Sequence, residues 1–315
     1  MSGRIRKRFT GRKAAIMALV ASVLLIAAIG FFFNRRAILI GLSGLRYRPK
    51  VPSEAQVMKD LEYAVFDGTA LKLDIYTPGS QGRFPLIVWL HSGAWKTLDK
   101  SCIEQGVMDQ VRRGYALASV DYSLSFERKW PAQLFQIRAA ILWLKKNSPF
   151  YGIDPDKIVV WGMSAGGHLA SMIGATGNTV FPYDADKKTA DNSHRVQGVI
   201  AWCAPSDLSE LGGAAYASAR QLLGYEPELD KTKEVPANPI KYLDSEDPPF
   251  FILHGVKDNA VPPSQSAGLH DALEAAGVPG ILRMIEGYSH EDVRFNSEVC
   301  MGEVRTFLDG LCMQD

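Results

Sequence analysis

A serine stands between two glycines in the segment Gly-Met-Ser-Ala-Gly at residues 162–166. Four β-prone residues at 158–161 come directly before this segment, and small residues that suit a helix follow from Ala165. We expect a strand to end at 161 and a helix to begin near Ala165. Ser164 then lies on a sharp turn where flanking side chains would collide, and glycine avoids that collision. A turn of this kind exposes the hydroxyl, which predicts a nucleophile at Ser164.

A serine hydroxyl needs a base, which is usually a histidine that is oriented by a buried carboxylate. Among the six histidines, His290 follows the last predicted strand in a loop that can carry its ring to the serine, and we predict that it is the base. We expect His254, at a strand end, to bond to nearby backbone, and His168 to pack beside the serine turn. His194 and His270 are expected at the surface.

The carboxylate that orients the base should also follow a strand. Asp258 does so in the segment His-Gly-Val-Lys-Asp and is the predicted acid, and Asp207, after another strand, is the second candidate. Either aspartate also suits a local role in which it accepts backbone N–H groups of its own loop. The chain order Ser164, Asp258, His290 is the one expected when the nucleophile lies on a strand–turn–helix elbow, which favours Asp258.

Acyl transfer also needs N–H donors that face the oxyanion of the transition state. The backbone N–H groups of Ser92 and Gly93, directly after a predicted strand, and of Ala165, after the serine, suit this role. Trp95 either lines the substrate pocket or packs in the core, and Met163 is a second candidate for the pocket. No motif indicates a metal ion or an organic cofactor.

Short apolar runs alternate with helical patterns along the chain. The first two runs flank a turn at 67–70 and alternate apolar and polar residues, which predicts an antiparallel hairpin. The later runs are apolar throughout, as in strands buried on both faces of a parallel sheet. The predicted strands are 61–66, 71–76, 86–90, 115–120, 158–161, 196–202, 250–253 and 281–285, and the clearest helices are 133–146 and 264–276. The alternation predicts an α/β fold with a doubly wound, mostly parallel sheet, whose catalytic groups gather beyond the carboxyl ends of the strands.

The charge of the chain is unevenly distributed. The 315 residues carry a formal net charge of +1, yet eight of the 35 Lys and Arg residues lie within 1–36, which contains no Asp or Glu. Without those eight, 27 basic residues stand against 34 acidic ones, and the remainder carries about −7. A nucleic-acid partner is therefore not expected, because binding phosphates needs a basic face on the folded domain.

Residues 14–33 contain no charged side chain and are long enough to cross a bilayer as a helix. We expect a transmembrane signal-anchor within a basic N-terminal region, 1–36, followed by a linker, 37–60, and a catalytic domain, 61–315. The positive-inside rule keeps the basic end cytoplasmic and places the catalytic domain on the extracytoplasmic side of the membrane. The alternative is a signal peptide cleaved after Gly30, which would release a secreted protein.

Four cysteines, Cys102, Cys203, Cys300 and Cys312, would lie in an oxidising compartment under this topology. Their disulfide pairing is left open by the sequence. A continuous helix between Cys300 and Cys312 would hold them about 18 Å apart, which is beyond disulfide reach. Cys203 lies in an apolar run and is expected to be a small buried hydrophobe.

Several motifs together resemble the α/β-hydrolase superfamily, and within it the carboxylesterases similar to hormone-sensitive lipase and to bacterial feruloyl-type esterases. The resemblance covers approximately residues 60–310, with HSGAW against the family's HGGGW and DYSLS against its DYRLS. The other matching segments are YGIDPDKIVVWGMSAGGHLA, DPPFFILHGVKDNAVP and GYSH. The resemblance implies a catalytic triad and an oxyanion hole made of backbone N–H groups. The triad would be Ser164, Asp258 and His290, and the oxyanion donors would be Ser92, Gly93 and Ala165.

The chain departs from the family pattern at three positions. Ser92 and Ala94 replace glycines of the oxyanion loop, and Ser123 replaces an arginine. Backbone donors survive such changes. The added bulk and the lost charge are therefore expected to alter the substrate range more than the catalysis.

The expected function is hydrolysis of small-molecule carboxylic esters with short or aromatic acyl groups, through an acyl-enzyme on Ser164. The alternative is amide or peptide hydrolysis by the same triad, as in formamidase-like or prolyl-oligopeptidase-like relatives. A catalytically silent binding module would be indicated by a missing triad residue, and none is missing. The segment between Asp207 and Asp247 is too short for a large lid, which disfavours long-chain lipid substrates. Nothing in the sequence indicates an oligomeric state.

Overall fold

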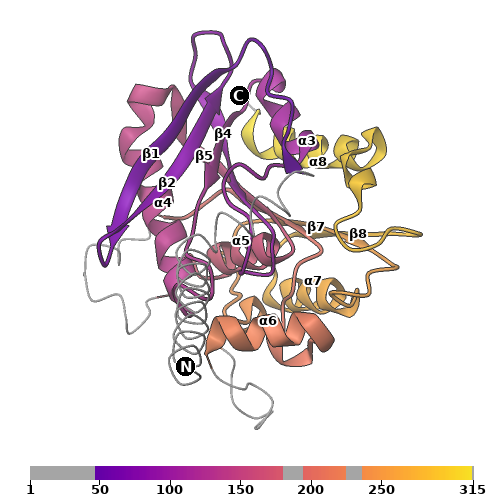
Figure 1. Cartoon of the computed structure of the whole chain (residues 1–315). Helices are drawn as coiled ribbons and strands as arrows, with labels where there is room; N and C mark the ends of the chain where they lie inside the picture. The colour runs from indigo at the N-terminus through magenta and orange to yellow at the C-terminus, as the bar shows by residue number, and fades with distance from the viewer. Residues whose placement is uncertain (1–46, 180–193, 225–235, 314–315) are drawn as a thin grey trace, which may run out of the picture. The chain divides into compact units, whose positions relative to one another are not determined.

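An eight-stranded sheet forms the centre of the folded unit (Figure 1). The computed structural model describes residues 47–179, 194–224 and 236–313. The chain divides into two units, 1–45 and 46–315, and the described residues belong to the second. The strands are β1 (Gln56–Phe66), β2 (Thr69–Thr77), β3 (Phe84–Leu90), β4 (Ala116–Val120), β5 (Ile153–Met163), β6 (Gly198–Trp202), β7 (Phe250–Gly255) and β8 (Gly280–Ile285). The α-helices are α3 (Gln105–Met108), α4 (Ala132–Tyr151), α5 (Ala165–Ala175), α6 (Gly213–Leu223), α7 (Ser264–Ala276) and α8 (Glu298–Cys312).

The strand order in the sheet is β1-β2-β4-β3-β5-β6-β7-β8. β1 pairs with β2, and β2 with β4, in the antiparallel direction, whereas all neighbours from β4 to β8 are parallel. The predicted α/β fold, with a mostly parallel sheet and an N-terminal antiparallel hairpin, is confirmed. Because the parallel strands share one direction, their carboxyl ends meet at one edge of the sheet, where loops from several strands can build one site.

The hairpin of β1 and β2 is tighter and begins earlier than the sequence predicts. Asp67 and Gly68 alone form the turn, with φ values of 45° and 77° that are typical of two-residue turns matching the strand twist. β1 starts at Gln56, so residues 56–60, assigned above to the linker, belong to the strand. Most side chains of this edge strand are exposed or half-buried, which weakens the hydrophobic pattern that would have marked its start.

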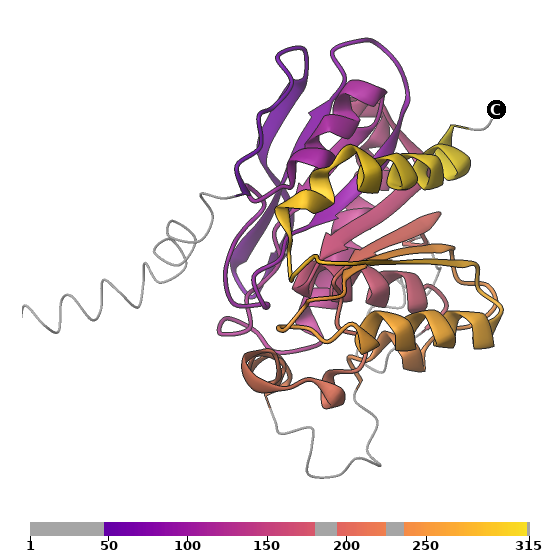
Figure 2. The same ribbon diagram turned by 90° about the vertical axis from the view of Figure 1, so that its right-hand side faces the viewer.

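Two hydrophobic layers lie on opposite faces of the sheet, because alternate residues of a strand point to opposite sides. In β5, Val160 packs into the layer that contains residues of α4, α5, α6 and α7. Val159 and Trp161 pack into the layer that contains residues of α3 and α8. Figure 2 shows α8 on one side of the sheet and α5 and α7 on the other.

Both helices that the sequence indicated most clearly are confirmed. α7 spans Ser264–Ala276, the predicted range, and ends at Gly277, whose φ of 75° suits the left-handed cap of a helix. α4 runs from Ala132 to Tyr151 and is longer than predicted, and it buries the apolar face that its spacing indicated. These helices hold the strands on either side of the site in fixed relative positions.

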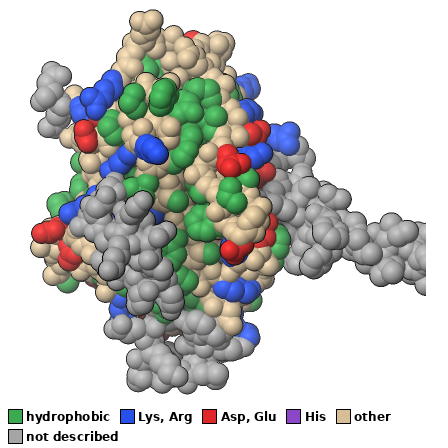
Figure 3. Space-filling view, turned by 90° about the vertical axis from the view of Figure 1, so that its left-hand side faces the viewer, with side chains coloured by type: hydrophobic (Ala, Val, Ile, Leu, Met, Phe, Trp, Pro, Cys, Tyr) green, Lys and Arg blue, Asp and Glu red, His purple; other side chains and the backbone are tan. Residues whose placement is uncertain are grey.

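The face of the folded unit in Figure 3 carries Lys and Arg side chains interspersed with Asp, Glu and hydrophobic ones. Neither sign of charge forms a continuous patch over that face.

In the described ranges, no helix combines the length and the apolar character that crossing a bilayer requires. The predicted span at 14–33 and the basic region 1–36 lie outside these ranges. The structure describes residues 47–60 of the predicted linker and the predicted catalytic domain except for 180–193, 225–235 and 314–315.

All four cysteines are buried as free thiols. Cys300 and Cys312 lie on the continuous helix α8, as expected from the argument that a helix between them keeps them apart. Cys203 has no exposed surface, and its prediction as a buried small residue is confirmed. Burial raises the pKa of the Cys203 thiol well above its ordinary value, so the thiol stays protonated.

Candidate active site

Ser164 lies on the turn between β5 and α5, with a φ of 53° and a ψ of −117° that residues other than glycine rarely adopt. A Cβ at Gly162 would lie 2.1 Å from the carbonyl oxygen of Gly166, and a Cβ at Gly166 would lie 2.0 Å from that of Leu90. Both positions therefore require glycine, for the steric reason that the sequence indicated. β5 continues two residues beyond 161 before it turns, to Met163.

The structure brings Ser164, His290 and Asp258 into one hydrogen-bonded chain. Ser164 Oγ lies 2.9 Å from His290 Nε2, and His290 Nδ1 lies 2.6 Å from Asp258 Oδ2. Because Asp258 can only accept the hydrogen bond from His290 Nδ1, Nδ1 carries the proton. Nε2 can then accept a hydrogen bond from the serine hydroxyl. A Cβ at Gly255 would lie 2.4 Å from the carbonyl oxygen of Tyr288, so the loops after β7 and β8 can approach only because residue 255 has no side chain.

The carboxylate of Asp258 is fully buried and accepts four hydrogen bonds. Oδ1 accepts from the backbone N–H groups of Ala260 and Val261, at 2.9 and 2.8 Å. Oδ2 lies 2.6 Å from His290 Nδ1 and 3.1 Å from His254 Nε2. Burial acts to raise the pKa of Asp258, but the hydrogen bonds from His254, His290 and Val261 outweigh it and hold the pKa well below its usual range. Asp258 is therefore charged at neutral pH and stabilises positive charge on His290.

The loop after β3 bends sharply beside the serine turn. Gly93 has a φ of 104°, and a Cβ there would lie 2.2 Å from the carbonyl oxygen of Thr97, so the position admits only glycine. Ala94 and Trp95 follow with φ values of 52° and 58°, in the left-handed region that favours glycine. Three successive left-handed residues turn the backbone so that peptide groups line the cavity described next.

A cavity of about 380 Å³ opens over Ser164. It is lined by Gly93, Ala94, Trp95, Lys96, Thr97, Ser164, Ala165, Pro205, Ala214, Ala215, Ser218, Ala260, Val261, His290 and Glu291. In the described part of the chain, the backbone N–H groups of Ser92, Gly93 and Ala165 make no hydrogen bond to a protein acceptor. These three groups are thus available to an oxygen atom of a ligand bound above Ser164.

Trp95 lines this cavity, whereas Met163 does not. Met163 is the last residue of β5 and packs with Trp161 and Trp202 in the layer that contains α3 and α8. The expectation that Met163 contributes to the substrate pocket is therefore wrong. The alternation of the strand directs its side chain to the same face as residues 159 and 161, and only the turn at Ser164 reaches the cavity.

Residues 73–273 match the BD-FAE family. The match covers more than half of the chain and includes the serine elbow, the loop after β3 and Asp258. The chain belongs to the BD-FAE family, on an α/β-hydrolase fold. His290 lies beyond the matched residues, and its place in the site comes from the geometry above.

Relatives of this BD-FAE protein include named esterases. Esterase LipQ of Mycobacterium tuberculosis is 32% identical over 253 residues, which cover 75% of this chain and 58% of LipQ. The kynurenine formamidase of Drosophila melanogaster is 24% identical over 247 residues, which cover 77% of this chain and 78% of the formamidase. A truncated carbohydrate esterase from gut microbiota superposes with a TM-score of 0.72 at 25% identity, over 84% of this chain and 100% of that one. The chain thus spans little more than half the length of LipQ.

His254 contacts Asp258 in the site of this BD-FAE protein, and the sequence analysis did not predict this contact. Its Nε2 lies 3.1 Å from Asp258 Oδ2 and 3.0 Å from the carbonyl oxygen of Val261, so Nε2 carries the proton. Its Nδ1 lies 2.6 Å from Ser266 Oγ. The predicted bond to nearby backbone exists, but His254 also fixes the carboxylate that orients His290. The four-residue spacing between His254 and Asp258 is the signal that the sequence offered.

Asp207, the second candidate for the acid, has a local role instead. Its Oδ1 accepts from the Ser209 N–H at 3.0 Å and from Asn238 Nδ2 at 2.8 Å, and the residue caps a short 3₁₀ helix at 208–210. This is the loop-capping role that the sequence analysis kept open for either aspartate. Asp207 therefore shapes the loop after β6 rather than contacting His290.

Three other histidines compare differently with their expected positions. His168 packs beside the elbow as expected, with its Nε2 2.7 Å from the carbonyl oxygen of Ala237. Burial lowers the pKa of His168 to about 4, against the opposing effect of that carbonyl, so the ring is neutral. His194 was expected at the surface but is buried, and His270 is half-buried. The polar composition of this loop indicates only its average exposure. His194 lies four residues before the buried strand β6, so it differs from that average.

Glu291 is a second residue of the site that no sequence pattern indicated. Its Oε1 accepts a hydrogen bond from the hydroxyl of Ser92, and its Oε2 accepts one from the hydroxyl of Tyr47 at 2.5 Å. These partners lie 199 and 244 residues away along the chain. The sequence predicts an oxyanion role for the backbone N–H of Ser92 and only added bulk from its side chain, whereas the structure gives its hydroxyl a carboxylate partner.

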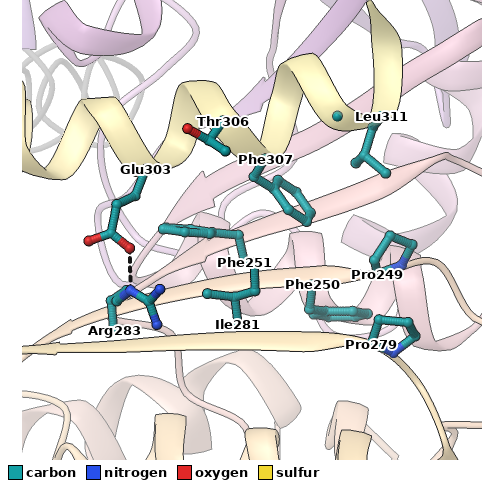
Figure 4. Close-up of a pocket in the computed structure, with 11 residues that line it drawn as sticks. Pro249, Phe250, Phe251, Pro279, Ile281, Arg283, Glu303, Thr306, Phe307 and Leu311 are labelled. Carbon is teal, nitrogen blue, oxygen red and sulfur yellow. Dashed lines mark hydrogen bonds and ion pairs between the residues drawn. The ribbon is translucent and has the colours of Figure 1, made fainter. Parts of the chain in front are cut away.

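Two further cavities differ in their relation to the site. One of about 530 Å³ shares His290 with the catalytic cavity and adds the polar residues Lys257, Asn259 and Ser289. The other, of about 460 Å³, lies between α8 and the strands β7 and β8 and has no lining residue in common with the catalytic cavity (Figure 4). Phe251 and Phe307 face this apolar cavity, and an Arg283–Glu303 ion pair lies at one end of it.

Cys203, Asp258 and His290 offer sulfur, oxygen and nitrogen atoms within 4.8 Å of one another, which raises the question of a metal. Two ligand atoms bound to one zinc ion in tetrahedral geometry stand about 3.3 Å apart. Asp258 Oδ2 and His290 Nδ1 are only 2.6 Å apart, a separation typical of a shared proton. The arrangement therefore fits a hydrogen-bonded acid–base pair with a protonated thiol beside it.

Proposed function

We propose that this BD-FAE protein is a serine carboxylic-ester hydrolase that acts through an acyl-enzyme on Ser164. The observation that carries the proposal is the hydrogen-bonded chain from Ser164 Oγ through His290 to Asp258, at 2.9 and 2.6 Å, at the wall of a ligand-sized cavity. The esterase activity in the names of LipQ and of the gut-microbiota structure supports this proposal.

Acylation follows from the placement of these groups. Ser164 Oγ attacks the ester carbonyl carbon while His290 Nε2 takes the hydroxyl proton, and Asp258 stabilises the resulting imidazolium through Nδ1. The carbonyl oxygen becomes an oxyanion in the space where three unoccupied backbone N–H groups lie. When the tetrahedral intermediate collapses, the C–O bond to the alcohol breaks, and the alcohol oxygen takes the proton from His290 Nε2.

Deacylation repeats the same steps with water as the nucleophile. His290 Nε2 takes a proton from the water as its oxygen attacks the acyl carbon. The bond from the acyl carbon to Ser164 Oγ then breaks, and the serine regains its proton from His290. The products are a carboxylic acid and a free hydroxyl on Ser164.

We propose short or aromatic acyl groups as substrates. The cavity of about 380 Å³ is at the lower end of the range for small-ligand sites. Its lining includes the almost fully buried Trp95 and the small side chains of Ala214, Ala215 and Ser218 from α6. These walls suit an acetyl or butyryl group or a planar aromatic acid better than a long flexible chain.

A series of p-nitrophenyl esters, from acetate to octanoate, together with methyl ferulate, tests this function. We expect kcat/KM to be highest for acetyl, butyryl or feruloyl esters and to fall for octanoate. Ser164→Ala should abolish turnover and labelling by a fluorophosphonate probe. If the Ser164→Ala protein hydrolysed the esters at the rate of the natural chain, Ser164 would not be the nucleophile, and the proposal would be withdrawn.

Amide hydrolysis by the same triad is the second candidate, and the similarity to a kynurenine formamidase over most of both chains favours testing it. A p-nitroanilide and a p-nitrophenyl ester with the same acyl group distinguish the two activities, because the acylation chemistry differs only in the leaving group. We expect the ester to be the better substrate. A higher kcat/KM on the anilide or on N-formylkynurenine would assign the protein to amide hydrolysis.

We further propose that residues 14–33 anchor the protein in a membrane with the catalytic domain on the extracytoplasmic side. The uncharged length of this segment and the basic residues that precede it support the proposal. Membranes washed with high salt should retain the full chain, because salt releases proteins held by charge but not those held in hydrocarbon. A mature chain that starts at Phe31 would show signal cleavage and a secreted protein instead.

A further inference from the structure

The carboxylate of Glu291 joins three parts of the chain at the catalytic cavity. It accepts a hydrogen bond at Oε1 from Ser92, in the loop after β3, and one at Oε2 from Tyr47, before β1. The same Oε1 lies 3.8 Å from Nε2 of His290. One side chain thus faces the oxyanion loop, the base and the N-terminal end of the folded unit.

The backbone of Glu291 is in a conformation that favours glycine. Its φ is 50°, in the left-handed region that side chains with a Cβ disfavour. Burial raises the pKa of the Cys203 thiol, and the backbone N–H of Glu291, which faces this thiol, acts in the opposite direction. Residues kept in such conformations cluster at functional sites. Glutamate at position 291 therefore supplies a carboxylate, which glycine would not.

The carboxylate is also placed to act on charge that develops during the reaction. His290 becomes positive when it takes the serine proton, and Asp258 stabilises that charge from the Nδ1 side. Glu291 lies on the Nε2 side, and its side chain is only 17% exposed, so water screens its charge incompletely. At this distance the carboxylate is placed to stabilise the charge that forms on His290 during the reaction.

We propose that Glu291 is a positioning residue of this site. Its carboxylate holds the oxyanion loop in place through Ser92 and supplies a second negative charge to the imidazolium of His290. This inference rests on the proposed esterase function and names a further residue that the reaction uses. Tyr47 completes the arrangement by occupying the other carboxylate oxygen.

The effect of pH on this arrangement depends on every group around His290. Asp258 faces Nδ1, Ser164 and Glu291 face Nε2, and the Cys203 thiol lies behind the ring. His254 acts on the ring only through Asp258. The remaining charged or polar groups of the two adjoining cavities are Lys96, Thr97, Ser218, Lys257, Asn259 and Ser289.

The first test is Glu291→Gln, which keeps the shape and an acceptor oxygen but removes the charge. We expect kcat on p-nitrophenyl acetate to fall about tenfold with little change in KM, as for a lost charge-assisted hydrogen bond. The acidic limb of the kcat/KM profile should also move to lower pH. The reason is that catalysis needs neutral His290, and the imidazolium loses one of its two anionic neighbours. Replacing a residue with a purely structural role would not shift the acidic limb of the pH profile.

The second test is Glu291→Gly, which removes the side chain and relieves the left-handed backbone. We expect kcat to fall at least as far as in Glu291→Gln, while the Tm does not fall. Loss of rate without loss of stability separates a functional carboxylate from a structural one. Circular dichroism at the assay temperature confirms that the variant is folded.

Ser92→Ala tests the link to the oxyanion loop. We expect it to lower kcat, and Ser92→Ala combined with Glu291→Gly to lose little more than Glu291→Gly alone, because Glu291→Gly has already removed the contact with Ser92. Glu286→Gln is the matched control. It removes one exposed carboxylate from the same loop and should leave kcat and the pH profile unchanged.

The outcomes separate this inference from the proposed function. If the natural chain hydrolyses esters and Ser164→Ala does not, the proposed function stands. Glu291→Gln and Glu291→Gly with kcat within about twofold of the natural chain and an unmoved acidic limb would then overturn the role of Glu291 alone. If the natural chain shows no Ser164-dependent turnover, the proposed function fails, and the inference that rests on it fails with it.

Discussion

His254 donates from Nε2 to the same Oδ2 atom of Asp258 that accepts from His290 Nδ1, at 3.1 Å. Two imidazoles therefore converge on one carboxylate oxygen, and only one of them reaches Ser164. We expect His254→Phe, which fills the space but cannot donate, to lower kcat about tenfold and leave KM nearly unchanged. Steady-state kinetics on p-nitrophenyl acetate check this. A variant with unaltered kcat would mean that the backbone N–H groups of the loop hold Asp258 without help from His254.

The two candidate acids can be compared directly. Asp258→Asn removes the charge that holds Nδ1 protonated and stabilises the imidazolium, and we expect kcat to fall on the order of 10⁴-fold. Asp207→Asn keeps an acceptor oxygen at its loop cap and should change kcat by less than about threefold. A larger loss from Asp207→Asn than from Asp258→Asn would contradict the placement of Asp258 beside His290.

The substrate range should widen when Ala94 is replaced by glycine. Ala94 lines the catalytic cavity with a φ of 52°, so Ala94→Gly both removes a methyl group from the cavity and relaxes the backbone. We expect a Tm that is unchanged or raised, a kcat on the acetyl ester that changes by less than about threefold, and a higher relative rate on methyl ferulate. A collapse of kcat on both esters, with the fold intact, would show that the loop needs the alanine to present its N–H groups.

Stability should depend on pH through His168. Burial lowers the pKa of His168 from 6.5 to about 4 in the folded protein. The unfolded chain therefore binds a proton at this histidine below pH 6.5, whereas the folded chain does not bind it until about pH 4. This contribution to stability is complete above pH 6.5 and is lost as the pH falls towards 4, by roughly 3 kcal/mol over the window. His168→Gln, which can still donate to Ala237, should show a shallower fall in free energy of unfolding between pH 7 and 4.5. Urea denaturation at several pH values measures the difference, and equal slopes would mean that the buried ring is accessible to protonation.

The N-terminal boundary of an active soluble domain should depend on Tyr47. A chain that begins at Arg46 keeps the hydroxyl that binds Glu291, whereas one that begins at Val51 loses it. We expect the shorter chain to be folded but several-fold slower than the longer one, and Tyr47→Phe in the longer chain to reproduce most of the loss. Equal kcat values for the two chains would show that Tyr47 does not contribute to the site.

The serine elbow was predictable because its cause is local. The two glycines, the apolar strand and the small helical residues lie within 158–170, and the steric demands of the turn act among those residues alone. The positions of the strands along the chain, and the loops that carry Asp258 and His290, followed from short-range patterns as well. The range of α7 was correct because its apolar spacing and its terminal glycine both lie in the segment itself.

The contacts that the sequence did not indicate join distant segments. Ser92 and Glu291 are 199 residues apart, and nothing in either neighbourhood marks the other as a partner. Met163 was misplaced because one residue separates a strand side chain that points into the core from a turn residue that reaches the cavity. The start of β1 was placed too late because an exposed edge strand has little hydrophobic pattern to display.

Ser164 and His290 are 126 positions apart in the chain, which bears on when the proposed site can form during synthesis. Ser164 leaves the ribosome well before the loop after β8, which carries His290 and approaches Gly255 through Tyr288. Domains generally fold as units once their last strands are available. A chain that ends before the loop after β8 therefore lacks His290, and we expect such a fragment to show no Ser164-dependent ester turnover.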